Sequence, residues 1–467
     1  MAPKFGTSGL RGLVSELTPA LVSEYVRAFL AACPIGTGLY VARDLRPSSP
    51  DIAAAVIAAA RGAGIQVTDC GEAPTPALAL ASMHAGAAAV MITGSHIPAD
   101  RNGLKFYLPD GEISKADEAA IRAALESAPA VIGPDQGALR SAEVGPAWVA
   151  RYVAAFGATA LRGLKIGVWS HSAVSRDLLV QTLHELGAEV IELGRSDSFI
   201  PVDTEAVPDW AKAKIASWVT AHRLDALVST DGDGDRPLVA NALGRVIPGD
   251  ILGQITATVI GAEQVVTPIS SNSGVEAEGR FGRVMRTRIG SPFVIEGMKA
   301  LGGRVVGYEA NGGFLLGFPA TLAKGILAPL ATRDSLLPII APLSCLRKTG
   351  SLADLVAREP ARFTATDRLE GVEPVTSRAL IERFRADQAR LAAFLSSLDE
   401  TPLHIDQTDG LRINCASGRV VHFRPSGNAP ELRLYVEAET AFAADDLLAK
   451  GLSGLARAIT TRLGWAP

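Results

Sequence analysis

The sequence predicts an α/β protein with three similar mixed α/β domains and a C-terminal α+β domain, arranged around a central cleft. In three long segments an apolar strand is followed by a Gly/Asp/Ser loop and then by an Ala/Leu-rich helix. Strands that alternate with helical patterns of about 10–15 residues indicate βαβ units and mainly parallel sheets. The C-terminal part breaks this rhythm, because strands joined by turns lie there between helical stretches.

The first three segments show the same order of elements. The first has strands at 38–44 and 87–93 around helical stretches, and the second has strands at 164–170, 188–194 and 224–230. The third has strands at 264–270 and 304–310 with the helical run SPFVIEGMKALGG between them. In the C-terminal part we predict a helix at 382–398, antiparallel strands within 409–439 and a closing helix at 443–463. The predicted domains are 1–145, 146–245, 246–355 and 356–467.

Composition excludes several classes of partner. The net charge is −4, only 5% of residues are aromatic, and there is no long basic run, so neither nucleic acid nor a membrane surface is expected as a partner. The four cysteines lie far apart without a CxxC pair, which is typical of reduced thiols and not of a disulfide framework or a zinc site. No leader is recognisable, and no apolar run reaches the roughly 18 residues of a membrane span. We expect a cytoplasmic protein, monomeric or weakly dimeric.

The first loop with candidate catalytic residues is TGSHIPADRNGLKF, which follows the strand that ends at Thr93. Ser95 is a candidate nucleophile, but a serine needs a base or an electrophilic partner to react. His96 and Lys105 can move a proton or contact a phosphate. A plain surface turn explains the same residues, since Ser, Asn and Gly favour turns. The GxSxG frame of the α/β-hydrolases is absent.

The second loop is STDGDGDRP, with Asp231, Asp233 and Asp235 at every second position. Three carboxylates so close together repel one another unless a hard cation binds them. The alternating glycines let the loop curl so that the three side chains face one point. An EF-hand would need Gly at position 236 and Glu at 242, and the chain has Arg236 and an alanine there. Mg²⁺ therefore fits best, with Arg236 suited to a phosphate; the alternative is a solvated acidic turn.

The third loop, GYEANGGFLLG, places Glu309 two residues before Asn311. In an extended loop both side chains would point the same way, and a carboxylate beside an amide reads sugar hydroxyls well. A hairpin turn at Asn311-Gly312 is an equally good explanation.

The fourth loop, RPSGNAPELRLY, is rich in hydrogen-bond donors. Backbone amides, a hydroxyl and a guanidinium that converge are a common way to hold a phosphate. An ordinary turn is the alternative. The candidate residues are Arg424, Ser426, Gly427, Asn428 and Arg433.

Each predicted domain carries one of these loops, and a cleft between domains would bring them together. In open parallel sheets, ligands bind beyond the carboxyl ends of the strands. Together the loops supply a serine, three carboxylates suited to Mg²⁺, groups that can bind sugar hydroxyls and groups that can bind a phosphate. There is no GxxxxGK[ST] motif for a nucleotide. Phosphoryl transfer between a serine and a sugar phosphate needs little more than this set of groups.

The sequence resembles the α-D-phosphohexomutase superfamily, and within it the bacterial phosphomannomutase/phosphoglucomutase branch. The resemblance is carried by KFGTSGLRG, TGSHIPADRNGLK, DGDGDR, YEANGG and RPSGNAPE, which occur in the superfamily order over residues 5–433. It implies a fold of three α/β domains and a flexible fourth one. It also implies interconversion of mannose 1-phosphate and mannose 6-phosphate through a phosphoserine and a hexose 1,6-bisphosphate intermediate.

The resemblance also implies roles for individual residues. Ser95 would carry the phosphoryl group and, with the three aspartates, would coordinate one Mg²⁺. Lys105 would carry the proton of the attacking sugar hydroxyl, with His96 and Arg11 assisting electrostatically. The third loop would read sugar hydroxyls, and the fourth would hold the non-reacting phosphate.

Three positions depart from the superfamily pattern. Ile97 replaces an Asn, Gly313 stands where the sugar loop usually has a His, and Ser291 replaces another His of the third domain. These departures leave open the choice between mannose, glucose and glucosamine. The alternatives are a phosphoglucomutase or phosphoglucosamine mutase of the same superfamily, a phosphatase that uses the same serine, or a sugar-phosphate-binding protein without catalysis.

Overall fold

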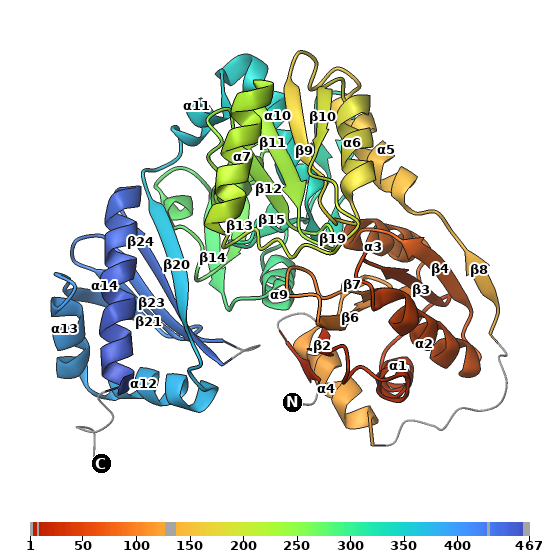
Figure 1. Ribbon diagram of the computed structural model, residues 1–467, viewed down its shortest axis with the longest axis horizontal. Helices are drawn as coiled ribbons and strands as arrows, with labels where there is room; N and C mark the ends of the chain where they lie inside the picture. Colours follow the sequence, from red (N-terminus) through yellow and green to blue (C-terminus); the bar gives the residue numbers. More distant parts are fainter. Residues whose placement is uncertain (1–2, 7–8, 127–136, 427–429, 461–467) are drawn as a thin grey trace. The chain divides into compact units, whose positions relative to one another are not determined.

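The structure, a computed structural model, describes residues 3–6, 9–126, 137–426 and 430–460. It divides into two compact units, one formed by residues 1–266 and 290–358 and the other by 267–289 and 359–467. The first unit contains three mixed α/β sheets, and the second contains an antiparallel sheet with helices (Figure 1). The predicted fold class of three α/β domains followed by an α+β domain is therefore confirmed.

The first sheet has the strand order β1-β2-β6-β5-β3-β4-β8, with β7 paired to β6. Its central strands β3, β4 and β5 are parallel, and β6 runs antiparallel to β5. β5 reads AAVMI and is buried throughout, as expected for a strand covered on both faces. The strands are β1 (Lys4–Phe5), β2 (Leu10–Leu13), β3 (Leu39–Arg43), β4 (Val67–Glu72), β5 (Ala88–Ile92), β6 (Arg101–Leu108), β7 (Gly111–Glu112) and β8 (Leu139–Ser141).

Four helices accompany this sheet. Apolar side chains of α1, α2 and α4 form one core with the strands, while α3 packs against β3 and β5. Proline at the start of α1, α2 and α3 suits the first helical turn, where the missing N–H would have no partner. The helices are α1 (Pro19–Ala32), α2 (Ser49–Gly62), α3 (Thr75–His84) and α4 (Lys115–Ala124).

The second sheet has the order β10-β9-β11-β12. β9 is parallel to both β10 and β11, whereas β11 and β12 form an antiparallel hairpin whose turn is the DGDGDR loop. The elements are α5 (Gly145–Phe156), β9 (Lys165–Trp169), α6 (Arg176–Glu185), β10 (Glu189–Leu193), α7 (Asp209–His222), β11 (Ala226–Thr230) and β12 (Pro237–Asn241).

The third sheet has the order β13-β15-β16-β19 within the first unit. The YEANGG loop is the turn between the antiparallel strands β15 and β16. The elements are α8 (Gly249–Val259), β13 (Gln264–Pro268), α9 (Ser291–Leu301), β15 (Val305–Tyr308), β16 (Phe314–Leu316), β17 (Ala320–Thr321), β18 (Ile326–Leu327), β19 (Leu330–Asp334), α10 (Leu336–Thr349) and α11 (Leu352–Val356).

The second unit is built on a fully antiparallel sheet of order β20-β24-β23-β22-β21, with α14 packed against β20 and β24 (Figure 1). The single helix predicted at 382–398 is wrong in one respect, because two helices meet at Asp387, which leaves the helical backbone. The elements are η1 (Ser273–Glu276), β14 (Arg283–Thr287), β20 (Phe363–Glu370), α12 (Pro374–Ala386), α13 (Gln388–Ser396), β21 (Pro402–Asp406), β22 (Leu411–Cys415), β23 (Val420–Pro425), β24 (Glu431–Ala438) and α14 (Ala441–Thr460).

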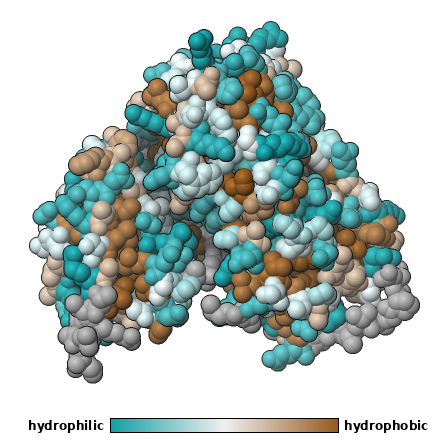
Figure 2. Space-filling model, viewed as in Figure 1, coloured by the Kyte–Doolittle hydropathy of each residue, from teal (hydrophilic) through white to brown (hydrophobic). Residues whose placement is uncertain are grey.

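The exposed surface carries large apolar side chains on many different elements. In the face shown in Figure 2, small apolar patches lie between polar residues. Among the described residues, no helix combines the length and apolar character that crossing a membrane requires. The large apolar side chains that are exposed are Leu139, Trp210, Leu243, Ile326, Phe363, Val375, Leu403 and Phe442.

Candidate active site

Ser95 lies in the loop that follows β5 and is fully buried. Its φ angle is 56°, in the left-handed region that residues other than glycine rarely adopt. The backbone N–H of Ser95 donates to Oγ1 of Thr93 at 2.7 Å. A strained backbone held by its surroundings fixes the direction of the serine side chain, and such strain clusters at functional sites.

Arg46 stabilises the loop that carries Ser95, here called the serine loop, by hydrogen bonds to its backbone. Its Nη2 donates to the carbonyls of Ser95 and Ile97 at 2.9 and 2.6 Å, and its Nη1 donates to those of Pro98 and Arg101 at 2.7 and 2.9 Å. One buried guanidinium thus donates to three carbonyls of the loop and to the carbonyl of the first residue of β6. These hydrogen bonds satisfy backbone groups that would otherwise be buried without a partner.

Asp44 holds Arg46 in place. Its carboxylate accepts from Nε of Arg46 at 3.1 Å and from the hydroxyls of Ser49 and Thr93, each at 2.6 Å. Burial raises the pKa of Asp44, while the charge of Arg46 opposes that shift. No motif in the sequence indicated either residue; the available indication was that Asp44 directly follows β3 and that Arg46 lies two residues further on.

The predicted acidic triad is assembled at the turn between β11 and β12. One carboxylate oxygen from each of Asp231, Asp233 and Asp235 lies within 4.8 Å of the others, and all three residues are buried. Oγ of Ser95 donates to Oδ2 of Asp231 at 2.5 Å, although 136 residues separate them. Gly232 permits this approach, because a Cβ there would lie 2.7 Å from the carbonyl oxygen of Ser95.

The backbone of this acidic loop is held by residues at the beginnings of three helices. The carbonyls of residues 232–234 accept, in order, from the N–H of Val174 at 3.0 Å, the N–H of Thr75 at 2.9 Å and Oγ of Ser335 at 2.7 Å. These three residues precede or begin α6, α3 and α10, one helix from each α/β domain. Helix N-termini carry partial positive charge, so they also suit a cluster of carboxylates.

Cations surround the triad. Nζ of Lys105 donates to Oδ2 of Asp233 at 2.5 Å and to Oδ2 of Asp235 at 2.7 Å. Burial alone would raise the pKa of Asp233, but the charge and hydrogen bond of Lys105 hold it well below its ordinary value. For Asp231, burial and the charges of the other two aspartates raise the pKa well above its ordinary value.

The triad fits a divalent metal ion. Oδ1 of Asp233 and Oδ1 of Asp235 are buried and have no hydrogen-bond partner among the described residues. Oxygen atoms left without a donor in a buried site are expensive unless a cation binds them. Carboxylate oxygens are the ligands that Mg²⁺ prefers, and a site of three protein ligands leaves positions for phosphate oxygens.

His96 lies between the serine and Arg236. Its Nδ1 is 3.3 Å from Oγ of Ser95 and accepts from Nη1 of Arg236 at 2.9 Å, while Nε2 is 3.8 Å from a carboxylate oxygen of Asp203. Because Nδ1 of His96 accepts a hydrogen bond from Arg236, the proton of the imidazole ring is on Nε2. Burial alone would raise the pKa of Asp203, but nearby positive charge, including that of Arg236, lowers it. No pattern in the sequence indicated Asp203.

Arg11 belongs to the same electrostatic cluster. It lies on β2, which pairs with β6 so that Arg11 faces Gly103 across the ladder. Burial and then the positive charges of Arg236 and Arg333 lower the pKa of Arg11 to about 10, while Asp233 and Asp235 oppose the shift.

Glu309 and Asn311 are both buried, but they have different partners. A carboxylate oxygen of Glu309 accepts from Arg333 at 3.2 Å, whereas Oδ1 of Asn311 accepts from the N–H of Gly313 at 3.0 Å and so stabilises its own turn. Of the two interpretations of this loop, the extended loop is wrong and the hairpin turn at Asn311-Gly312 is confirmed, because the N–H of Gly312 donates to the carbonyl of Glu309 in a tight turn. The sequence analysis did not identify Arg333.

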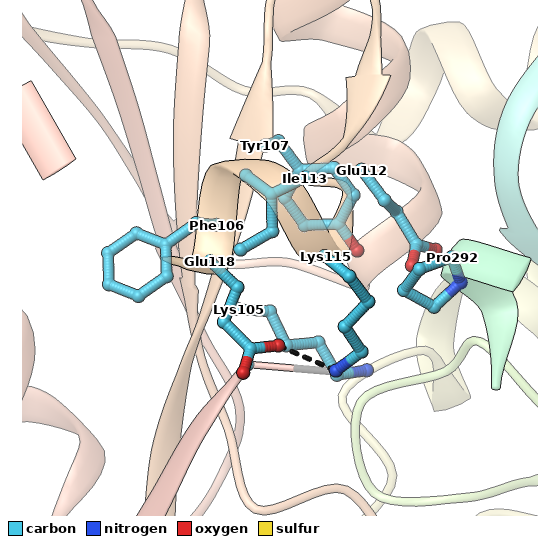
Figure 3. Close-up of a pocket in the computed structure, with 9 residues that line it drawn as sticks. Lys105, Phe106, Tyr107, Glu112, Ile113, Lys115, Glu118 and Pro292 are labelled. Carbon is cyan, nitrogen blue, oxygen red and sulfur yellow. Dashed lines mark hydrogen bonds and ion pairs between the residues drawn. The ribbon is translucent and has the colours of Figure 1, made fainter. Parts of the chain in front are cut away.

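Ser291 begins α9 and has a structural partner. Its hydroxyl donates to Glu112 at 2.5 Å, and the other oxygen of Glu112 accepts from Thr332 at 3.0 Å. Ser291 therefore ties the end of the first sheet to the third. A small cavity beside Lys105 is lined by Glu112, Pro292 and neighbouring residues (Figure 3). Its volume of about 10 Å³ is enough for one water molecule and too small for a hexose phosphate.

The residues of the fourth loop lie in the second unit, and Gly427 and Asn428 fall outside the described residues. Nε of Arg424 donates to Asp409 at 3.0 Å, and Nη2 of Arg433 donates to Glu431 at 3.2 Å. Ser426 is buried, and its N–H donates to the carbonyl of Glu431 at 2.9 Å.

Four domain models of one family match the chain in order. They describe the phosphoglucomutase/phosphomannomutase α/β/α domains I, II and III, at residues 2–131, 149–244 and 248–363, and the C-terminal domain at 374–450. A phosphomannomutase of Sinorhizobium fredii is 44% identical over 97% of this chain and 99% of its own length. One of Salmonella muenchen is 42% identical over 93% of this chain and 92% of its own length.

A solved structure gives the same result for the fold. The crystal structure of a phosphoglucomutase/phosphomannomutase family protein from Burkholderia thailandensis covers 99% of this chain and 98% of its own, with a TM-score of 0.77 at 22% identity.

Proposed function

We propose that this chain, which belongs to the phosphoglucomutase/phosphomannomutase family, interconverts mannose 1-phosphate and mannose 6-phosphate through a phosphorylated Ser95. The observation that carries the proposal is the 2.5 Å contact between Oγ of Ser95 and Asp231 of the acidic triad. This contact supports the proposal because the serine hydroxyl that would carry the phosphoryl group lies beside the carboxylates that would bind a divalent cation.

The general class of the reaction is established by the relatives. The chain is a phosphohexomutase, an intramolecular phosphotransferase of the isomerase class that acts on hexose phosphates. This assignment leaves the non-catalytic binding protein without support. The preference for mannose is part of the proposal, and two phosphomannomutases at 44% and 42% identity favour it.

Asp231, Asp233 and Asp235, together with an oxygen of the phosphorylated serine, would hold one Mg²⁺. When bound, the ion would offset the negative charge that spreads over the transferring phosphoryl group. The loop that carries the triad is held by hydrogen bonds from all three α/β domains, so its carboxylates are placed before any ligand arrives.

In the first half-reaction, the free 6-hydroxyl of mannose 1-phosphate attacks the phosphorus atom on Ser95. A bond forms between the sugar oxygen and phosphorus, and the bond between phosphorus and Oγ of Ser95 breaks. The ammonium of Lys105 would give a proton to the leaving Oγ and take the proton of the sugar hydroxyl in its place. The products are mannose 1,6-bisphosphate and unmodified Ser95.

In the second half-reaction, the bisphosphate has turned over and Oγ of Ser95 attacks the phosphorus at C1. The bond between that phosphorus and O1 breaks, Lys105 would give a proton to the leaving O1, and it would take the proton of the serine hydroxyl in its place. Mannose 6-phosphate leaves and Ser95 is phosphorylated again. A catalytic amount of hexose 1,6-bisphosphate would restore any enzyme that has lost its phosphate.

The remaining predicted residues have supporting roles in this scheme. Arg236 and Arg11 supply positive potential around the phosphoryl group, and His96 would assist by accepting from Arg236, which holds that guanidinium beside Ser95. Glu309 and Asn311 would contact sugar hydroxyls. The non-reacting phosphate would bind to Arg424, Ser426, Gly427, Asn428 and Arg433.

A coupled assay tests the activity. Purified protein with Mg²⁺, a trace of hexose 1,6-bisphosphate and mannose 1-phosphate should form mannose 6-phosphate without net release of phosphate. Comparison of kcat/KM for the 1-phosphates of mannose, glucose and glucosamine tests the substrate preference. The proposal is wrong if none of the three turns over, and the mannose assignment is wrong if glucose or glucosamine gives the higher value.

Intact-mass measurement tests the phosphoserine separately from turnover. Protein isolated after exposure to the bisphosphate should include a species heavier by about 80 Da, the mass of one phosphoryl group. Ser95→Ala should lack both this species and the activity. The matched control Ser82→Ala changes a buried serine whose hydroxyl bonds only within α3, and it should retain the heavier species.

A further inference from the structure

One buried guanidinium joins two of the functional loops. Arg333 lies near the end of β19 and is 2% exposed. Its Nη2 donates to Oδ2 of Asp235 at 2.8 Å, and its Nη1 donates to Oε2 of Glu309 at 3.2 Å. The acidic loop and the YEANGG loop thus share a single positive charge, although 98 and 24 residues of chain separate Arg333 from these two partners.

The stem of Arg333 explains an unusual glycine. A Cβ at position 313 would lie 2.6 Å from Cδ and 2.9 Å from Cγ of Arg333, closer than real carbon atoms approach. The φ angle of Gly313 is outside the left-handed region, so its backbone conformation does not itself require glycine. The space that a side chain at 313 would need is filled by the arginine.

We propose that Arg333 is a positioning residue that couples the sugar-contacting Glu309 to the metal-ligating Asp235, and that Gly313 is the small residue that makes room for it. The proposal rests on the proposed function, which makes Glu309 a sugar reader and Asp235 a metal ligand. The coupling makes each loop sensitive to what the other binds.

The physical basis of the coupling is the division of one charge between two carboxylates. When Glu309 accepts from Arg333, the guanidinium is partly neutralised, and Asp235 keeps more of its attraction for a cation. Without a carboxylate at 309, the guanidinium charge acts more fully on Asp235 and competes with a metal ion there. Arginine suits this bridge because its planar fork presents separate donors to two acceptors at once.

A double-mutant cycle on metal affinity tests the coupling without an activity measurement. Mn²⁺ is the probe, and its dissociation constant is measured by the electron paramagnetic resonance signal of the free ion. We expect Glu309→Gln to weaken Mn²⁺ binding by about fivefold in the native background, the low end of typical coupling energies. In the Arg333→Met background, the same change should alter binding by less than about twofold.

A second ion pair of the same composition serves as the control. Arg304 and Glu263 lie at the surface with 3.6 Å between Nε and the carboxylate, outside the cluster around the triad. Glu263→Gln, Arg304→Met and the double variant should all have the Mn²⁺ dissociation constant of the native protein. If Glu309→Gln has the same effect with and without Arg333, the coupling does not exist and the proposal is wrong.

Substitutions at Gly313 test the steric half of the proposal. Gly313→Ala should raise KM for the sugar phosphate by about fivefold and leave kcat within about twofold, because it displaces Arg333 from Glu309. In the Arg333→Ala background, Gly313→Ala should have no further effect on KM. An equal increase in both backgrounds would overturn the assignment of Gly313.

Arg333→Lys provides a second route if Arg333→Met does not fold. Lysine keeps the charge but has a single nitrogen, so the cycle with Glu309→Gln should lose most of its coupling while the triad keeps a cation nearby. The Mn²⁺ measurements remain readable even if the native protein turns over no hexose phosphate. Such an absence of turnover would show that the proposed function is wrong, while the Mn²⁺ dissociation constants of the variants would still decide whether the two loops are coupled.

Discussion

The ion pairs of the acidic triad and those of the fourth loop use the same residue types in different surroundings. Lys105 binds Asp233 and Asp235 with side chains that are at most 5% exposed. In the second unit, the Arg433 side chain is 32% exposed and that of its partner Glu431 15%. The first set joins distant parts of the chain in a buried network, whereas the second lies on two neighbouring strands and is partly exposed. Breaking the first should therefore affect folding and catalysis, and breaking the second should affect binding alone.

The largest expected effect follows from removing Lys105. Lys105→Met removes the cation that pairs with buried Asp233 and one of the two that donate to Asp235, and breaking such a buried pair typically costs about 3–5 kcal/mol of unfolding free energy. Urea denaturation of the metal-free protein measures the loss. The control is Lys115→Met, because Lys115 pairs with Glu118 at 2.6 Å but its side chain is 37% exposed. The control should lose less than about 1 kcal/mol, and similar losses in both variants would contradict the comparison.

The second largest expected effect follows from changing Arg46, which stabilises the serine loop. Arg46→Lys leaves several loop carbonyls without donors, so we expect a loss of about 2–4 kcal/mol and a fall in kcat of about 100-fold from misplacement of Ser95. Urea denaturation and the coupled assay provide the two numbers. The control Arg43→Lys alters a neighbouring arginine whose carboxylate partners are 3.9 and 4.0 Å away. A fully active Arg46→Lys enzyme would show that the guanidinium does not position the loop.

A histidine of the second unit predicts a pH dependence of stability. Nε2 of His422 donates to the carbonyl of Asp409 at 2.6 Å, and burial lowers the pKa of His422 to about 4. The unfolded chain therefore binds more protons between pH 6.5 and 4, so the folded state loses stability as the pH falls through this window. The loss due to His422 is about 3 kcal/mol by pH 4.

His422→Phe isolates that contribution. Urea denaturation at several pH values should show a shallower fall in stability below pH 6.5 for the variant than for the native protein. His404→Phe, at an exposed position, is the control and should leave the slope unchanged. An unchanged slope in His422→Phe would mean that its imidazole is protonated in the folded state.

The smallest expected effect is at the exposed ion pair of the fourth loop. Glu431→Gln removes the carboxylate that holds Arg433, and we expect a change in stability below about 0.5 kcal/mol. If Arg433 holds the non-reacting phosphate, its release from Glu431 should lower KM for the sugar phosphate by up to about twofold. Glu370→Gln, on the neighbouring strand, is the control. A loss of stability comparable to that of Lys105→Met would remove the distinction between the two regions.

Short motifs explain why much of the site was predictable. Asp231, Asp233 and Asp235 lie within five residues, so the alternation of aspartate and glycine determines their convergence by itself. The fold class was predictable for a related reason, because strand and helix periodicities are local. The extended YEANGG loop was wrong because hydrogen bonds within the turn outweighed simple alternation of side chains.

Arg46, Asp203 and Arg333 could not be predicted in the same way. Each is a single polar residue with no distinctive neighbours, and its partners come from distant parts of the sequence. The link from Arg46 to Ser95 spans 49 residues and that from Arg333 to Asp235 spans 98. Nothing in a local pattern specifies which strand ends meet.

The sequence by itself determined the fold class, the order of the functional loops, the acidic triad and the candidate serine. These properties depend on residues a few positions apart, whose backbone geometry and side-chain chemistry act locally. Tertiary structure alone decided that Lys105 faces the triad, that Arg46 holds the serine loop and that Arg333 fills the space over Gly313. Charges and close contacts depend on distance in space, and packing of the sheets sets those distances.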